Sequence, residues 1–240
     1  MYKEQKISMV IPCHNEEEGV SQLIPLLNDV PIVDEIVIVD NNCTDRTAEI
    51  AADLGARVVR ETIPGYGAAH RAGITAAAGD IIVTMDGDCT YPVESISRLV
   101  KTLIDGGFDF ITCRRMPDRW RNFNGLLRLI GNVVLTATTK ILFFRKIMDS
   151  QSGMWVFKKS VFSRIEPISD GMGFSEEIKL RAFIRDDVKS LELPILYFDR
   201  VGMSALNLWH DGFTNWIFLF QLRFKGITRW ERRHVVSKDA

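Results

Sequence analysis

Residues 80–88 read DIIVTMDGD, a β-branched run that ends in two carboxylates one residue apart. The run predicts a short buried strand, and the glycine between the carboxylates eases the turn that follows. Asp86 and Asp88 therefore leave the strand together. Two such carboxylates can hold a hard divalent cation, which can in turn hold a diphosphate. Asp and Gly are also ordinary turn residues, so the neighbouring elements decide between a metal site and a plain turn.

Strand and helix patterns alternate through the first half of the chain. The predicted strands cover residues 7–12, 35–40, 57–60, 80–84 and 108–113, and the helices between them cover 16–28, 46–54, 65–78 and 92–104. Short connections between alternating elements predict a doubly wound, mostly parallel α/β sheet with helices on both faces. Ligands bind such sheets beyond the carboxyl ends of the strands. The polar residues at or just after predicted strand ends are His14, Glu16, Asp40, Asn41, Asp86, Asp88 and Arg114.

The charge of the chain is balanced overall but uneven along its length. A net charge of −1 over 240 residues gives no general attraction for nucleic acid. Between Ile111 and Met148, however, eight basic residues accompany a single acid, Asp118. The segment is either a solvated face or a surface for phosphate or membrane. The four cysteines lack metal-ligand spacing, which favours reduced packing residues in a cytosolic protein.

Two stretches of the second half mix apolar, aromatic and basic residues. They cover 126–148 and 213–230, and neither has the roughly 18–20 uninterrupted apolar residues that span a bilayer. They are either interfacial helices on a membrane or helices that cover the core. We expect one domain over residues 1–230, in which 1–113 hold the nucleotide sugar and 114–230 supply the acceptor side, followed by a mobile tail at 231–240.

Several motifs resemble those of family 2 glycosyltransferases. VIPCHNE at 10–16 is similar to their IPxxNE opening, IVDNNCTD at 38–45 to VVDDGSTD, GYGAA at 65–69 to GxGxA, and MDGD at 85–88 to the metal-binding DAD. In the second half, DSQSG at 149–153, FDRVGMS at 198–204 and WHDGF at 209–213 resemble DxxSGF, RxxGxSK and DGxR of the dolichyl- and polyprenyl-phosphate mannose or glucose synthase branch. The resemblance covers residues 7 to about 224.

The resemblance implies a GT-A fold and an inverting, metal-dependent transfer from a UDP- or GDP-sugar to a polyprenyl or dolichyl phosphate. It implies a catalytic set of Asp88, Glu177 and Arg200, with Asp86 and Asp88 holding Mg²⁺ or Mn²⁺. The nucleotide side would comprise Pro12, His14, Glu16, Asp40, Asn41, Gly67 and Asp86. The acceptor phosphate would meet Arg114, Arg128, Arg200 and Ser204.

Three departures bear on the substrates rather than on the reaction class. Asn41 replaces a second Asp, Thr90 replaces a metal-contacting Gln, and Ala205 replaces a Lys. A phosphate acceptor is already ionised and needs arginines, whereas a saccharide or protein hydroxyl needs a base. For that alternative acceptor the base would be Glu176 or Glu177, and we favour Glu177. A non-catalytic nucleotide-binding protein is a third reading, which the intact Asp86 and Asp88 disfavour.

A lipid acceptor also implies a location for the protein. Since a polyprenyl chain stays in the bilayer, we expect a peripheral protein on the cytoplasmic face of the membrane. The sequence leaves open a homo-oligomer or a separate membrane subunit as partner.

Overall fold

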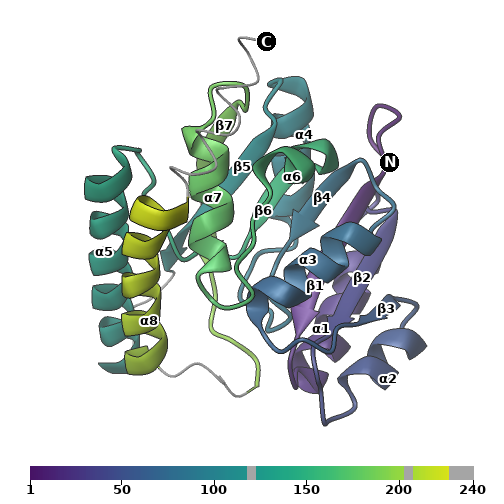
Figure 1. The fold of residues 1–240 in the computed structure, drawn as a ribbon. Coiled ribbons are helices and arrows are strands. Elements are labelled where there is room, and N and C mark those ends of the chain that lie inside the picture. Colours follow the sequence, from purple (N-terminus) through teal and green to yellow (C-terminus); the bar gives the residue numbers. More distant parts are fainter. Residues whose placement is uncertain (118–122, 203–207, 227–240) are drawn as a thin grey trace.

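The structure of the chain is a computed structural model, and it describes residues 1–117, 123–202 and 208–226 (Figure 1). Ser204 and the predicted tail at 231–240 lie outside these residues. The strands are β1 (Ile7–Cys13), β2 (Glu35–Asp40), β3 (Arg57–Arg60), β4 (Ile81–Thr84), β5 (Phe110–Pro117), β6 (Trp155–Lys158) and β7 (Ser190–Tyr197). The helices are α1 (Glu17–Asn28), α2 (Thr47–Asp53), α3 (Tyr66–Ala76), α4 (Ser95–Asp105), α5 (Phe123–Phe143), α6 (Lys159–Ile165), α7 (Phe174–Ile184) and α8 (Leu208–Gln221), followed by a π-helical turn, η1 (Leu222–Gly226).

The seven strands form one sheet in the order β3-β2-β1-β4-β6-β5-β7. Strand β6 runs antiparallel to both of its neighbours, β4 and β5, while the other pairs are parallel. The predicted mostly parallel α/β sheet is confirmed, and the reversed strand is the part that the alternation did not predict. Because Thr84 at the end of β4 pairs with Trp155 at the start of β6, the loop before β6 reaches the edge where Asp86 leaves the sheet.

Both faces of the sheet are covered by helices, as predicted (Figure 1). Successive side chains of β1 and β2 point to opposite faces: Ile38 packs with α1, α2 and α4, whereas Val37 and Val39 pack with α3, α6 and α7. Strands buried on both faces read as continuous apolar runs, which is why these strands were found from the sequence.

Helix α4 begins three residues later than its predicted start at Pro92. The amides of Ser95 and Ile96 donate to the carbonyls of Pro92 and Val93, so residues 92–94 form a tight turn before the α-helix. Proline suits a turn as well as a first helical position, and the sequence did not distinguish the two.

Helices α5 and α8 lie side by side at one flank of the molecule, next to α7 (Figure 1). Leu135, Phe143, Leu180 and Leu219 are among the residues of a separate apolar cluster that these three helices share. No helix in the described part of the chain is long and apolar enough to cross a membrane. Each of the two mixed stretches, 126–148 and 213–230, contributes side chains to this cluster. Other side chains of both helices are exposed.

Candidate functional site

Four charged side chains meet at the carboxyl edge of the sheet. Asp86 and Asp88 follow β4, Glu16 follows β1, and Arg200 follows β7. An Arg200 guanidinium nitrogen lies 2.6 Å from Glu16 Oε1, and another lies 3.7 Å from Asp88 Oδ2. The backbone holds this arrangement, since the amides of Phe198 and Val201 donate to the carbonyls of Thr90 and Asp88. The segment that carries Arg200 is therefore fixed to the loop that carries the aspartates.

The charge balance at this edge suits a divalent cation. Burial, together with the nearby Asp88 carboxylate, raises the pKa of Asp86 to about 7, and burial raises the pKa of Glu16 despite Arg200. A cation would relieve this crowding of carboxylates. Among the described residues, no group of three or more His, Cys, Asp or Glu side chains could hold a metal alone. Asp86 and Asp88 would supply two carboxylates, and a Mg²⁺ or Mn²⁺ would take its other oxygens from diphosphate and water.

Each of these two aspartates also receives a hydroxyl hydrogen bond. Tyr66 Oη donates to Asp86 Oδ1 (3.2 Å), and Thr90 Oγ1 donates to Asp88 Oδ1 (2.7 Å). The sequence marked Thr90 only as a departure from a metal-contacting Gln and gave Tyr66 no role. An aromatic residue between two glycines carries no signal that would have separated it from a packing residue.

The predicted nucleotide residues of β1 and β2 do lie together. His14 Nδ1 is 2.9 Å from the carbonyl oxygen of Asn41, and Asp40 accepts a hydrogen bond from the Cys43 amide. Pro12 is the half-buried penultimate residue of β1, and His14 is exposed. His14 therefore presents its side chain to solvent at this edge of the sheet.

The side chain of Asn41 forms hydrogen bonds to the loop that leads to α3. Its amide nitrogen donates to the carbonyls of Glu61 and Ile63, and its oxygen accepts from the Gly65 amide. An ionised Asp has no donor for the two carbonyls, which explains the Asn at this position. The structure thus gives Asn41 a role in fixing this loop.

Gly67 is not placed as a phosphate-binding residue. Its amide and that of Ala68 both donate to the carbonyl of Asp170. A Cβ on Gly67 would lie 2.1 Å from the carbonyl oxygen of Ser169, and one on Gly65, with φ of +142°, would lie 2.2 Å from that of Asp170. The close approach of residues 169–170 accounts for both glycines. The amides of Gly67 and Ala68 at the start of α3 already donate to a protein carbonyl.

The two candidate bases on α7 are buried. Glu177 is 0% exposed and accepts hydrogen bonds from Arg181 Nε and from the amides of Ile168 and Ser169. Glu176 is 1% exposed and accepts from Gln151, and burial raises its pKa to about 8. Glu177 is placed to hold a loop onto the helix rather than to take a proton from an acceptor.

Two of the predicted acceptor residues, Arg200 and Arg114, have described side chains. Arg200 lies at the aspartates, and Arg114 is half-buried on β5. Arg128 belongs to α5, and its side chain is outside the described part. The neighbour of Arg114, Arg115, pairs with Asp149 through two hydrogen bonds of 2.8 and 2.9 Å. The charge run in the sequence did not single out Arg115.

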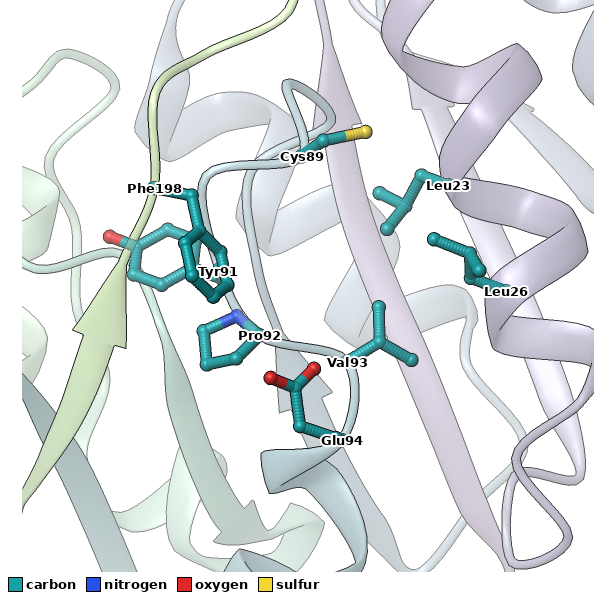
Figure 2. A pocket seen from close by; sticks show the side chains of 8 residues that line it. All are labelled: Leu23, Leu26, Cys89, Tyr91, Pro92, Val93, Glu94 and Phe198. Carbon is teal, nitrogen blue, oxygen red and sulfur yellow. The ribbon is translucent and has the colours of Figure 1, made fainter. Parts of the chain in front are cut away.

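A hollow of about 340 Å³ lies between α1 and the residues that follow Asp88 in the sequence (Figure 2). Leu23 and Leu26 of α1 face Tyr91, Pro92 and Phe198 across it in Figure 2, and Glu94 is its one charged described lining residue. Its walls are mostly apolar and therefore do not suit a diphosphate.

Known proteins similar to this chain include enzymes that transfer hexoses. The low-salt glycan biosynthesis hexosyltransferase Agl6 of Haloferax volcanii is 32% identical over 219 residues, which are 89% of this chain and 52% of that protein. The dolichyl-phosphate hexose transferase of the same organism is 29% identical over 214 residues, 88% of this chain and 91% of that protein. This chain thus spans about half the length of the first relative.

Solved structures show the same fold. Glucosyl-3-phosphoglycerate synthase from Mycobacterium tuberculosis, in complex with Mg²⁺ and uridine diphosphate, matches 92% of this chain and 79% of its own with a TM-score of 0.76 and 20% identity. The family model of glycosyl transferase family 2 matches residues 8–166. The fold, the paired aspartates and this match agree, and the chain belongs to glycosyl transferase family 2.

Proposed function

We propose that this glycosyltransferase moves a hexosyl group from a nucleoside-diphosphate sugar to a polyprenyl phosphate, with inversion. A phosphate oxygen of the acceptor forms a bond to the anomeric carbon. The bond from that carbon to the β-phosphate oxygen breaks, and its electron pair leaves with the nucleoside diphosphate. The names of the dolichyl-phosphate hexose transferase and of the dolichol-phosphate mannosyltransferase of Pyrococcus furiosus, 28% identical over 217 residues, support this acceptor class.

The donor would lie along the carboxyl ends of β1, β2 and β4. Pro12, His14 and Asp40 would border the nucleoside, and Asp86 and Asp88 would hold Mg²⁺ or Mn²⁺ against the diphosphate. Such a cation, when bound, neutralises the negative charge that develops on the leaving group. The structures of glucosyl-3-phosphoglycerate synthase with uridine diphosphate and Mn²⁺ or Mg²⁺ support the choice of metal.

The observation that carries the acceptor proposal is the position of Arg200. Its guanidinium lies at Asp88, beside the carboxylates that would hold the diphosphate, and Glu16 fixes it there. An arginine at this point can bind an ionised phosphate in a bidentate manner, through two N–H···O hydrogen bonds. A hydroxyl acceptor would require a base instead, and Glu177 is buried and fully engaged.

Arg200→Ala should reduce kcat/KM for a short polyprenyl phosphate by about 30- to 1000-fold, because truncating one partner of a close charge pair costs roughly 2–4 kcal/mol. Slow hydrolysis of the donor should change much less. Both rates are measured with a radiolabelled sugar nucleotide and Mn²⁺. Arg46→Ala, which removes an exposed arginine paired with Glu49, serves as control. Equal loss of hydrolysis and transfer would contradict an acceptor role. Equal use of a neutral alcohol or of a soluble phosphorylated acid would contradict the lipid-phosphate assignment.

Helices α5 and α8 would bring the site to the membrane that holds such an acceptor. The exposed apolar residues of α5 recur at three- and four-residue steps, as do those of α8, so each set forms one stripe. Trp216 Nε1 donates to Thr138 Oγ1 and joins the two helices. The stripes comprise Ile130, Val133, Val134 and Ile141 of α5 and Phe213, Trp216 and Ile217 of α8, and the exposed side chains of Phe144, Met148 and Phe224 lie just past the ends of these helices. We assign this surface to a peripheral membrane contact.

Binding to anionic vesicles should weaken in an Ile141→Ser/Phe213→Ser variant. These side chains are 70% and 62% exposed, so the fold should tolerate the changes. Vesicle partitioning should fall by about 100-fold or more, since burial of each large apolar side chain is worth about 1.5–3 kcal/mol. Co-sedimentation measures the partitioning. Ile168→Ser is the control, because Ile168 is 71% exposed but lies outside α5 and α8. Unchanged recovery with vesicles, or a dimer that the double substitution dissociates, would overturn the membrane assignment.

A further inference from the structure

Each aspartate of the proposed metal site has one oxygen that accepts a hydrogen bond from a hydroxyl. Tyr66 Oη meets Asp86 Oδ1 at 3.2 Å. Thr90 Oγ1 meets Asp88 Oδ1 at 2.7 Å, and the Thr90 amide donates to the same oxygen at 3.2 Å. The second oxygen of Asp88 faces Arg200. The hydroxyls come from different elements, the first residue of α3 and the loop before α4, yet they act on neighbouring carboxylates in the same way.

We propose that Tyr66 and Thr90 are positioning residues for metal binding, which rests on the proposed function. A hydroxyl that donates to one carboxylate oxygen fixes the rotation of the group and leaves the second oxygen for a cation. Partners of this kind set metal affinity, and their loss typically weakens binding by about 10- to 100-fold. Thr90 would thus fix the rotation of the Asp88 carboxylate.

Tyr66 is held in place from several sides. Its ring packs against His70 with centroids 4.4 Å apart, and a Cβ on Gly153 would lie 2.4 Å from its hydroxyl. His70 is 0% exposed, and neither of its ring nitrogens has a partner among the described residues. Burial lowers the pKa of His70 to about 3, so it is a neutral ring wedged between Tyr66 and Phe174. A buried imidazole without hydrogen bonds is unfavourable, and fixing the tyrosine gives it a function.

Thr90 is fixed as firmly. Its carbonyl accepts from the Phe198 amide, and the preceding Cys89 has a φ of +60°, which turns the chain back toward Asp88. The next residue, Tyr91, accepts a hydrogen bond of 2.7 Å from the Gly153 amide. Gly153 therefore lies against Tyr66, which carries one of the hydroxyls, and against Tyr91, which follows the residue that carries the other. The two aspartates are supported by one connected framework rather than by independent loops.

The inference is tested by Mn²⁺ affinity, measured from the free-ion electron paramagnetic resonance signal with and without uridine diphosphate. Tyr66→Phe and Thr90→Val remove each hydroxyl with little change of shape, and each should raise the Kd for Mn²⁺ by about 10-fold or more. Thr90→Ser keeps the hydroxyl and should restore affinity. Tyr2→Phe makes the same chemical change at an exposed hydrogen bond to Asp105 and should have no effect. Circular dichroism and thermal midpoints of the metal-free variants check that the fold is kept.

The outcomes separate this inference from the proposed function. Wild-type binding of Mn²⁺ together with Kd values within twofold in both variants would overturn the inference alone. Weaker binding in both variants, in a protein that transfers no sugar to polyprenyl phosphate, would support the inference and overturn the proposed acceptor. Absence of Mn²⁺ and Mg²⁺ binding by the wild-type protein, even with uridine diphosphate, would overturn both.

Discussion

Asp88→Asn should lower sugar transfer by about 1000-fold while leaving the protein folded. Electrostatic stabilisation of a leaving group is worth several kcal/mol, and a neutral amide attracts a divalent cation less than a carboxylate does. Burial and, after it, the nearby Asp88 carboxylate raise the pKa of Asp86. Removing the charge of Asp88 relieves part of this repulsion, so the unfolding midpoint should hold or rise. Steady-state transfer and thermal unfolding are measured on the same preparation.

The matched control for this change is Asp105→Asn, which alters an exposed aspartate at the end of α4 and should keep full activity. Excess chelator should act on the wild-type protein as the substitution does. Full turnover in chelator, or an Asp88→Asn protein with more than a tenth of the normal rate, would contradict a metal-dependent mechanism at this site.

Glu177→Ala should reduce the free energy of unfolding by about 3–5 kcal/mol, because removing one partner of a buried ion pair is strongly destabilising. Arg181 is 3% exposed, and the substitution also leaves the amides of Ile168 and Ser169 without their acceptor. For a chain of this length the midpoint should fall by roughly 10 °C. Chemical denaturation measures the loss.

Transfer by the folded Glu177→Ala protein should stay within a few-fold of normal below its midpoint. Glu49→Ala removes an exposed glutamate paired with Arg46 and should leave stability unchanged. A variant that keeps its stability but loses kcat would return Glu177 to the role of a base, and with it the hydroxyl acceptor.

The sheet was predictable where its strands are buried on both faces. Continuous apolar runs predict β1, β2 and β4 and the residues that follow them, and so predict Asp86, Asp88 and Glu16 at one edge of the sheet. The direction of β6 was not predictable, because the burial pattern of a strand is the same whichever way it runs. That direction is what brings Gly153 to Asp86.

The sequence does not predict which of two adjacent residues of like charge has a given role. Glu176 and Glu177 are adjacent on a helix that is buried nearly all round, so no periodicity distinguishes them. Arg114 and Arg115 are adjacent on a strand and point to opposite faces, and only Arg115 contacts Asp149. Their roles depend on what packs against each face, which lies far away in the sequence.

The position of β6 has a consequence for how the chain folds during synthesis. Strand β5 does not pair with β4, which precedes it, but with β6 and β7, which are made later. When the ribosome has released the first five strands, four can pair in their final order and the fifth must wait. An unpaired strand that waits for distant partners slows folding and exposes an edge to aggregation. Separating β1–β5 from β6 and β7 should therefore yield fragments that depend on each other to fold.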